Sequence, residues 1–183
     1  MGPDSKPRMV LSTCSGVDQM YMLQPHHGKP IVCNAPHVLT LKYPDQSQAV
    51  DIPLNVYLQQ HRPGLLFHQA IEYAEIPVSD PYLSGFYDSI LQTTISSNIV
   101  INSMRMRQEY LAGVIDCVGY IDDDCYVVQI KSDEMKENLC TLLYSLALIP
   151  EVSESHIRIH GKTKNIPTRI VRKLRTSGVY KAE

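Results

Sequence analysis

The stretch GVIDCVGYIDDDCYVVQIKSDEMKENLCTLLYSLALI, residues 113–149, decides the expected fold. Its first part is rich in β-branched residues, so we expect one strand over 113–121 and a second over 125–131, joined by a tight acidic turn into a β-hairpin. After this hairpin the apolar residues change to helical spacing over 133–149, with Ser132 as the expected N-cap. The stretch therefore predicts a hairpin followed by an amphipathic helix.

The same reading extends to both sides of this stretch. We expect a short amphipathic helix from Gly64 to the residue before Pro77, and little regular structure over residues 1–63, where eight of the twelve prolines lie. No internal repeat is apparent. The other expected elements are a short strand over 38–43, a helix over 82–92, a strand over 99–103, a strand over 155–160 and a basic helix from Pro167 to Arg175.

Length and composition indicate one globular domain. The chain has 183 residues, of which 44% are hydrophobic and 20% are charged. Its five cysteines show no close paired spacing and no secretory signal precedes them, so we expect reduced thiols in an intracellular protein. The longest apolar run, residues 139–149, is shorter than the roughly 20 residues that a membrane helix requires. We expect no membrane association.

The charge is unevenly distributed along the chain. Residues 157–183 carry eight cations and one acid, a net charge of +7, whereas the whole chain has a net charge of −2. A basic terminal segment on an acidic body is typical of proteins that contact a polyanion, although such segments are also often only solvated surface.

Three polar residues of the expected hairpin would share one region of the sheet. Asp116 lies on the first strand, and Gln129 and Lys131 lie two residues apart near the end of the second. One interpretation is an exposed cross-strand ion pair. The other is a metal-dependent phosphodiesterase site, in which Asp116 holds a divalent cation, Lys131 activates water, and His68 and Glu72 join from one face of the expected helix.

These residues also carry a family resemblance. The run Gly64-Leu-Leu-Phe-His68-Gln-Ala-Ile-Glu72, the segment Gly113-Val-Ile-Asp116 and the segment Gln129-Ile-Lys131-Ser132 resemble the motifs of RecB-type nucleases in the PD-(D/E)xK superfamily, in particular its mitochondrial exonucleases. The resemblance implies an α/β fold with a restriction-endonuclease-like mixed sheet flanked by helices. It implies a nuclease core over 64–160, after an irregular segment 1–63 and before a basic segment 161–183.

The resemblance also implies an activity, a cofactor and a compartment. The activity would be metal-dependent exonucleolytic hydrolysis of DNA, with single-stranded DNA preferred, in mitochondrial DNA maintenance. Mg²⁺ or Mn²⁺ would be held by Asp116, Gln129 and His68, with Lys131 completing the catalytic set. The expected substrate-binding residues are Glu72, Tyr144, Ser132, Arg169, Arg172 and Lys173.

Two positions depart from the family pattern. Gln129 stands where the family has an acidic metal ligand, and Cys140 stands where the following helix has a glutamine. Replacing a carboxylate with an amide removes one negative charge, which lowers the affinity for a divalent cation. The alternative is therefore an inactive nuclease-fold protein that binds nucleic acid or a protein partner, and a third possibility is a structural subunit.

Other candidate sites have weaker patterns. A zinc site would draw on Cys14, His26, His27, Cys33 and His37, but their spacing matches no compact ligand pair. Cys14 as a nucleophile lacks an identifiable base. The chain also has eleven tyrosines, which could stack on unpaired bases or serve the core.

Overall fold

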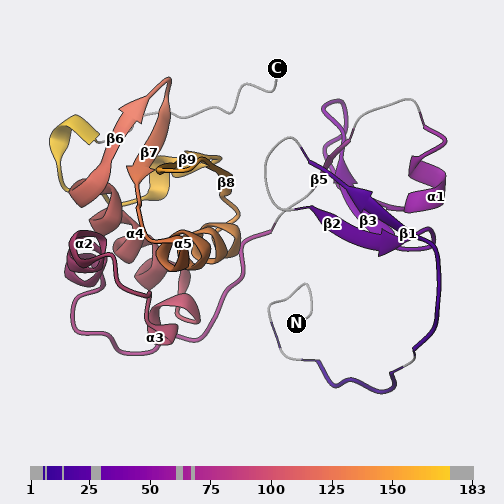
Figure 1. Ribbon diagram of the computed structural model, residues 1–183, viewed down its shortest axis with the longest axis horizontal. Coiled ribbons are helices and arrows are strands. Elements are labelled where there is room, and N and C mark those ends of the chain that lie inside the picture. Colours follow the sequence, from indigo (N-terminus) through magenta and orange to yellow (C-terminus); the bar gives the residue numbers. More distant parts are fainter. Residues whose placement is uncertain are drawn as a thin grey trace. The chain divides into compact units, whose positions relative to one another are not determined.

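The computed structural model describes residues 6, 8–13, 15–25, 30–60, 64–66 and 69–173, with the side chains of residues 65 and 66 excepted. The chain forms two compact units (Figure 1). One comprises residues 8–68, and the other comprises residues 69–183 together with residues 1–7. Each unit has its own hydrophobic core.

The N-terminal unit is built from short antiparallel strands. Strands β1 (Met20–Leu23) and β2 (Ile31–Asn34) form one pair, and β3 (Val38–Lys42) lies between β4 (Val50–Pro53) and β5 (Leu65–Leu66). The short helix α1 (Leu54–Tyr57) follows β4. The core of this unit consists of Cys33, Leu39, Leu41, Tyr43 and Leu54. The strand over 38–43 is thus confirmed, but the expectation of an otherwise irregular segment is wrong.

The larger unit is a four-stranded antiparallel sheet with helices against it. Its elements are α2 (Pro81–Leu91), α3 (Ser97–Val100), α4 (Met104–Val118), β6 (Gly119–Asp122), β7 (Cys125–Gln129), α5 (Asp133–Ser145), β8 (Ile149–Val152), β9 (His156–His160) and the short 3-10 helices η1 (Thr163–Asn165) and η2 (Val171–Lys173). The strand order is β6-β7-β9-β8. Helix α4 packs against β6 and β7, α5 packs against β8, and α2 packs on α4 (Figure 1).

The register of the sheet separates its two faces. Tyr126 pairs with Ile159 and Val128 pairs with Ile157, and all four side chains are buried toward the helices. Because side chains alternate along a strand, the residues between them face the other way, and we call that side the outer face. Its members are Tyr120, Asp122, Cys125, Val127, Gln129, Ile149, Glu151, His156, Arg158 and His160.

The segment expected as the first hairpin strand is mostly helical. Residues 113–118 form the end of α4, and the strand begins only at Gly119. The apolar run from Tyr110 to Ile115 is fully buried, because α2 covers one side of this helix and the sheet covers another. A helix buried on all sides has no polar stripe, so its sequence lacks helical periodicity and its β-branched residues suggest a strand.

The second half of the hairpin prediction is confirmed. Strand β7 pairs with β6 across a two-residue turn at Asp123 and Asp124, both of which have positive φ angles. Aspartate tolerates this left-handed conformation, which the tight hairpin turn requires. The helix after it is also confirmed, since the Ser132 hydroxyl accepts a hydrogen bond from the Met135 amide at the start of α5.

Three further expectations about local structure are wrong, whereas the helix over 82–92 and the strand over 155–160 are confirmed by α2 and β9. Residues 65–66 form a strand and residues 69–80 form no helix. Residues 97–100 form the short helix α3 in place of a strand, and no α-helix begins at Pro167 within the part that the structure describes. These runs are too short for an apolar pattern to distinguish between element types.

At the level of fold class, the expected α/β architecture is confirmed. Every strand pair among the described residues is antiparallel, however, whereas a mixed sheet was expected. None of the described helices is long and apolar enough to cross a membrane.

Candidate functional site

Asp116 lies in a buried hydrogen-bond network at the end of helix α4. Its Oδ2 accepts a hydrogen bond of 3.0 Å from the Tyr82 hydroxyl and two more from the backbone amides of Arg169 and Ile170. Its Oδ1 is buried and has no hydrogen-bond partner. The carboxylate thus joins α2, α4 and the chain segment that follows the sheet.

The basic segment after β9 is tied to the same network. Lys173 is buried, and its Nζ donates hydrogen bonds of 2.9 Å to the backbone carbonyls of Ile115 and Asp116. Burial lowers the pKa of this lysine. The Arg169 guanidinium stacks 3.7 Å from the centre of the Tyr82 ring. Lys173, which the sequence suggested as a substrate-binding residue, thus has its ammonium against the last carbonyls of α4.

Gln129 and Lys131 lie away from this network. Both are exposed, Gln129 at the end of β7 on the outer face and Lys131 two residues further along. The Lys131 and Ser132 amides donate to Oε1 of Gln92, the residue that ends α2. The expected juxtaposition of Asp116 with Gln129 and Lys131 fails because Asp116 is on a buried helix and not on the neighbouring strand.

The remaining predicted site residues do not lie together with Asp116 in the part of the chain that the structure describes. Glu72 accepts a hydrogen bond from the Met104 amide at the first turn of α4, where a carboxylate stabilises the helix N-terminus. Tyr144 is half-buried against the main core, and Arg172 is exposed. His68, like the Cys14, His26 and His27 of the zinc hypothesis, lies outside the described residues.

The surroundings of Asp116 do not suit a divalent cation. Its immediate neighbours are hydrogen-bond donors and the ammonium of Lys173, whereas Mg²⁺ requires several oxygen ligands. Among the residues described, no group of three or more His, Cys, Asp or Glu side chains could hold a metal ion. The geometry therefore gives Asp116 a structural role.

The two helices α2 and α4 carry a sequence repeat that the sequence analysis missed. Tyr82-Leu-Ser-Gly-Phe-Tyr-Asp88-Ser on α2 corresponds to Tyr110-Leu-Ala-Gly-Val-Ile-Asp116-Cys on α4, at an offset of 28 residues. The tyrosine, leucine, glycine and aspartate are identical, and two of the other four pairs are small residues. The signal was present in the sequence as the pattern Y-L-x-G-x-x-D.

The repeat has reciprocal geometry. Tyr82 donates to Asp116 at 3.0 Å, and Tyr110 donates to Asp88 at 3.0 Å. A Cβ added to Gly113 would lie 2.0 Å from the Tyr82 carbonyl oxygen, and one added to Gly85 would lie 2.1 Å from the Tyr110 carbonyl oxygen. The two glycines thus allow the helix backbones to touch, and the pair has an approximate two-fold relationship.

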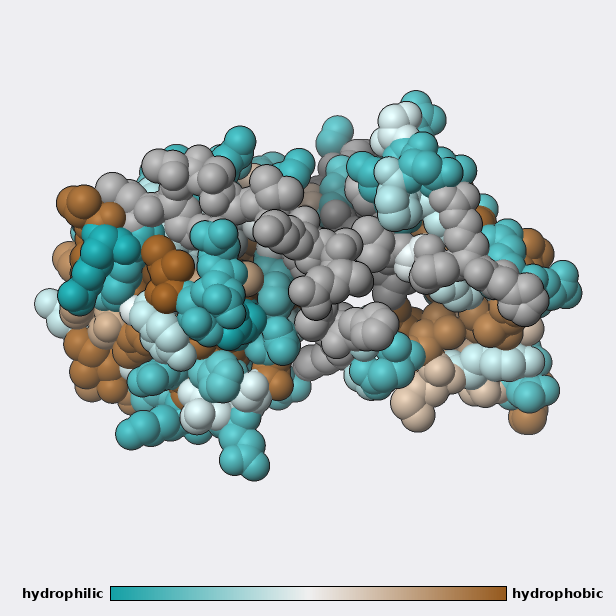
Figure 2. Space-filling view, turned by 90° about the horizontal axis from the view of Figure 1, so that it is seen from above, coloured by the Kyte–Doolittle hydropathy of each residue, from teal (hydrophilic) through white to brown (hydrophobic). Residues whose placement is uncertain are grey.

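The environments of the two helices are not equivalent. Leu111 and Ile115 of α4 are fully buried, but the corresponding residues of α2 are exposed, Leu83 at 43% and Tyr87 at 56%. Figure 2 shows hydrophobic side chains at the surface among hydrophilic ones. Helix α4 continues into a sheet that covers it, whereas α2 is followed only by α3 before the chain reaches α4. The helix is therefore repeated, but the sheet that follows it is present only after α4.

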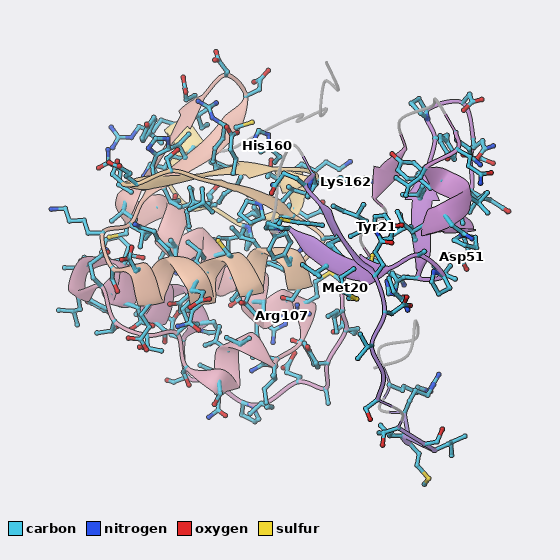
Figure 3. The ribbon with its side chains drawn as sticks, turned by 45° about the vertical axis from the view of Figure 1, so that its right-hand side comes forward. Met20, Tyr21, Asp51, Arg107, His160 and Lys162 are labelled. Atoms are coloured by element: carbon cyan, nitrogen blue, oxygen red, sulfur yellow. The ribbon has the colours of Figure 1, made fainter. Side chains whose placement is uncertain are left out.

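Arg107 holds the other end of helix α4. It is fully buried, and its guanidinium donates to the backbone carbonyls of Ile71, Asn102 and Ser145 and to the Ser145 hydroxyl. Figure 3 shows Arg107 on the far side of helix α5 from His160. Burial lowers the pKa of this guanidinium. Arg107 is a structural residue that joins the segment before α2 to α4 and α5.

The outer face of the sheet combines polar side chains of several kinds. Arg158 bonds to Asp122, and the Nε2 of His160 lies 2.7 Å from an oxygen of Glu151. Tyr120 and Gln129 are exposed on this face, while Val127 is buried at its centre. Donors, acceptors and a cation thus lie on adjacent strands of one face.

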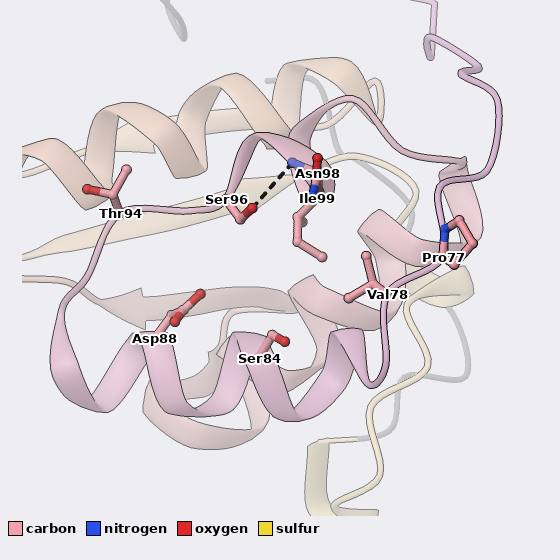
Figure 4. Close-up of a pocket in the computed structure, with 8 residues that line it drawn as sticks. All are labelled: Pro77, Val78, Ser84, Asp88, Thr94, Ser96, Asn98 and Ile99. Atoms are coloured by element: carbon pink, nitrogen blue, oxygen red, sulfur yellow. Dashed lines mark hydrogen bonds between the residues drawn. The ribbon is translucent and has the colours of Figure 1, made fainter.

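A separate hollow of about 390 Å³ lies beside α2 (Figure 4). It is lined by Pro77, Val78, Ser84, Asp88, Thr94, Ser96, Asn98 and Ile99. Asp88 is the one charged lining residue, and its carboxylate already accepts hydrogen bonds from Tyr110 and Thr93. The hollow offers no cluster of catalytic groups.

A comparison with protein families finds a match within the larger unit. The family model described as homing endonuclease matches residues 94–177. The matched stretch is slightly less than half of the chain and includes α4, α5 and the whole four-stranded sheet. A search of curated proteins finds no match.

This match corrects the family suggested by the sequence motifs. Homing endonucleases are a different nuclease family from the RecB-type enzymes, so the predicted RecB-type resemblance is wrong. The expected exonuclease activity on single-stranded DNA in mitochondrial DNA maintenance rested on that resemblance and is therefore not supported. A nuclease family and DNA as the ligand remain the common ground between the two interpretations.

Proposed function

We propose that the larger unit is a DNA-recognition domain of the homing endonuclease kind and that it contacts duplex DNA through the outer face of its sheet. The match of residues 94–177 to that family carries the proposal. A β-sheet face presents regularly spaced side chains, and several DNA-binding proteins place strands in a groove of the duplex.

The outer face has the side-chain chemistry that base recognition needs. Glutamine pairs with adenine through its amide, and arginine pairs with guanine through its guanidinium. Gln129 is exposed for such a contact, and Arg158 lies on the adjacent strand, where it is held by Asp122. His156 pairs with Gln129 in the register and lies on the same face. We assign these three side chains to base contacts.

Exposed lysines border the same strands. Lys131 follows β7, whereas Lys162 and Lys164 follow β9, and all three are exposed. Because β7 and β9 are antiparallel, these lysines lie at opposite ends of the central strand pair. Cations at both ends can contact phosphates while the strands between them face the bases. Arg172 belongs to the same basic segment and is exposed.

The helix repeat bears on the size of the DNA site. A complete two-fold arrangement would place one sheet after each helix of the pair, but only α4 is followed by a sheet. We therefore propose that this chain reads one half of the site that a two-sheet arrangement would read, with correspondingly lower affinity.

Cleavage of DNA is the second candidate function. The family match favours a DNA-cleaving hydrolase, and homing endonucleases typically use divalent metal ions. The described residues offer no carboxylate cluster for such an ion, and Asp116 is enclosed by donors. DNA recognition is therefore better supported than DNA cleavage as the function of this unit.

Both candidates can be tested in one series. Binding is measured by fluorescence anisotropy with a labelled randomised duplex and with its single strands at several salt concentrations. The proposal expects preference for the duplex and a steep loss of affinity as salt rises. Arg158→Ala should weaken binding, whereas Arg105→Ala, an exposed arginine on helix α4, should not. Incubation of supercoiled plasmid with Mg²⁺ and with Mn²⁺ tests cleavage, and preference for single strands would contradict the proposal.

A further inference from the structure

A cysteine, a histidine and a glutamate form a chain of contacts across three strands of the sheet. The Cys125 sulfur on β7 lies 3.6 Å from Nδ1 of His160 on β9, and Nε2 of the same ring lies 2.7 Å from a carboxylate oxygen of Glu151 on β8. All three belong to the outer face. The arrangement is independent of Asp116 and of the helix pair.

The two contacts of the imidazole determine what each nitrogen can do. A carboxylate that faces Nε2 accepts a hydrogen bond from it, which favours the tautomer with the proton on Nε2. Nδ1 then carries a lone pair directed toward the Cys125 thiol. A thiol next to a base that is oriented by a third group is the arrangement of an activated nucleophile.

The thiol lies among charged side chains. Arg158 lies on the same strand as His160 and on the same face, and its guanidinium is bonded to Asp122, which pairs with Cys125 in the register of the sheet. Cys125 is half-buried and forms no disulfide. The nearby acids are Asp124, which directly precedes Cys125 in the chain, Asp122, which pairs with Arg158, and Glu151, which contacts His160.

We propose that Cys125 is a nucleophilic thiol, activated by His160, whose ring Glu151 orients, and that it is a site of modification by hydrogen peroxide. In this reaction the thiol proton moves to Nδ1 of His160 and the thiolate sulfur attacks one peroxide oxygen. The sulfur–oxygen bond forms as the oxygen–oxygen bond breaks, and the departing hydroxide takes the proton from His160 to give water. The thiol becomes a sulfenic acid, and one molecule of peroxide is reduced.

Cys117 is the matched control within the same chain. It is also half-buried and forms no disulfide, but burial raises its pKa, and its charged neighbour is Lys173 where Cys125 has His160. Peptide mapping by mass spectrometry after brief exposure of the native protein to iodoacetamide gives a rate for each cysteine separately. The proposal expects Cys125 to react at least tenfold faster than Cys117. In urea the two rates should converge, because the difference depends on the folded arrangement.

Variants separate activation from simple exposure. His160→Gln should lower the Cys125 rate about tenfold, and Glu151→Gln should lower it by less, while the Cys117 rate stays unchanged in both. Hydrogen peroxide followed by dimedone should label Cys125 in the parent protein and leave Cys125→Ser unlabelled at that peptide. Equal native rates for Cys125 and Cys117 would overturn the proposal, as would an unchanged Cys125 rate in a folded His160→Gln protein. Neither result depends on DNA binding.

Discussion

The Tyr82 hydroxyl donates a 3.0 Å hydrogen bond to Asp116 across the α2–α4 interface, and the same contact recurs 28 residues later in the chain between Tyr110 and Asp88. Tyrosine and aspartate thus exchange roles between the two helices. This reciprocity identifies α2 and α4 as two copies of one element, although only α4 continues into a sheet. It also explains why Asp116 is buried in a helix interface, where the sequence motifs suggested a strand.

Gly113→Ala tests the contact between the helix backbones. Helix propensity alone predicts that alanine stabilises a helix by up to about 1 kcal/mol relative to glycine. The added Cβ would lie 2.0 Å from the Tyr82 carbonyl oxygen, however, so we expect a loss of about 3 kcal/mol or more in the free energy of unfolding. Gly85→Ala should behave in the same way, and Gly16→Ala, which has open space, should not. Urea denaturation followed by circular dichroism gives the sign directly, and stabilisation by Gly113→Ala would refute the close approach.

The repeat supplies its own control for core packing. Leu111 is fully buried under the sheet, whereas Leu83, its counterpart on α2, is 43% exposed. We expect Leu111→Ala to lower the free energy of unfolding by about 2–5 kcal/mol and Leu83→Ala to lower it by less than about 1 kcal/mol. Comparable losses in thermal or urea unfolding would mean that α2 is covered as α4 is.

Replacing Arg107 or Arg105 compares the contribution of a buried and an exposed arginine of helix α4 to the stability of the fold. Arg107 donates to three backbone carbonyls in the interior, so Arg107→Met removes three buried hydrogen bonds and should cost about 3 kcal/mol or more, although the Ser145 carbonyl keeps its bond from the Ile71 amide. Arg105 forms two ion pairs, with Glu75 and Glu109, but it is exposed to solvent, so Arg105→Met should cost far less than Arg107→Met. A larger loss for Arg105→Met, measured by urea unfolding, would contradict the structure.

The buried tyrosines give the stability a dependence on high pH. Burial raises the pKa of Tyr82 and that of Tyr110 above the ordinary value of 10.0, and the neighbouring aspartates raise them further. Above pH 10 the unfolded chain loses tyrosine protons that the folded chain keeps, so stability should fall as pH rises through this range. The double variant Tyr82→Phe with Tyr110→Phe should flatten this decline. An unaltered slope in urea titrations between pH 9 and 11 would show that these hydroxyls ionise as freely in the folded state.

How much of the fold could be predicted depended on which elements have a polar side. Helix α5 and strand β9 each have one buried and one accessible face, so the periodicity of their apolar residues predicted the correct element type. Helix α4 is buried from Tyr110 to Asp116, and its sequence looked like a strand. The site prediction depended on this expected strand, because only a strand at Asp116 would place that residue beside Gln129 and Lys131.

The sequence did contain a signal that would have helped. The pattern Y-L-x-G-x-x-D occurs at Tyr82 and again at Tyr110, and a repeated pattern with glycine at the fourth position predicts two equivalent helices in close contact. The outer-face contact between Cys125 and His160 could not be predicted, since it depends on a strand order that no local pattern specifies.

The most direct test of the central claim is selection from a randomised duplex library, followed by binding measurements with the selected sequence. The account predicts enrichment of a short sequence motif. It further predicts that Gln129→Ala relaxes the preference at one base pair, with a cost of about 1–3 kcal/mol in binding free energy, and that Lys131→Ala weakens all duplexes equally. If no motif is enriched, or if both variants bind the selected duplex as tightly as the parent, the outer face of the sheet is not a DNA-reading surface.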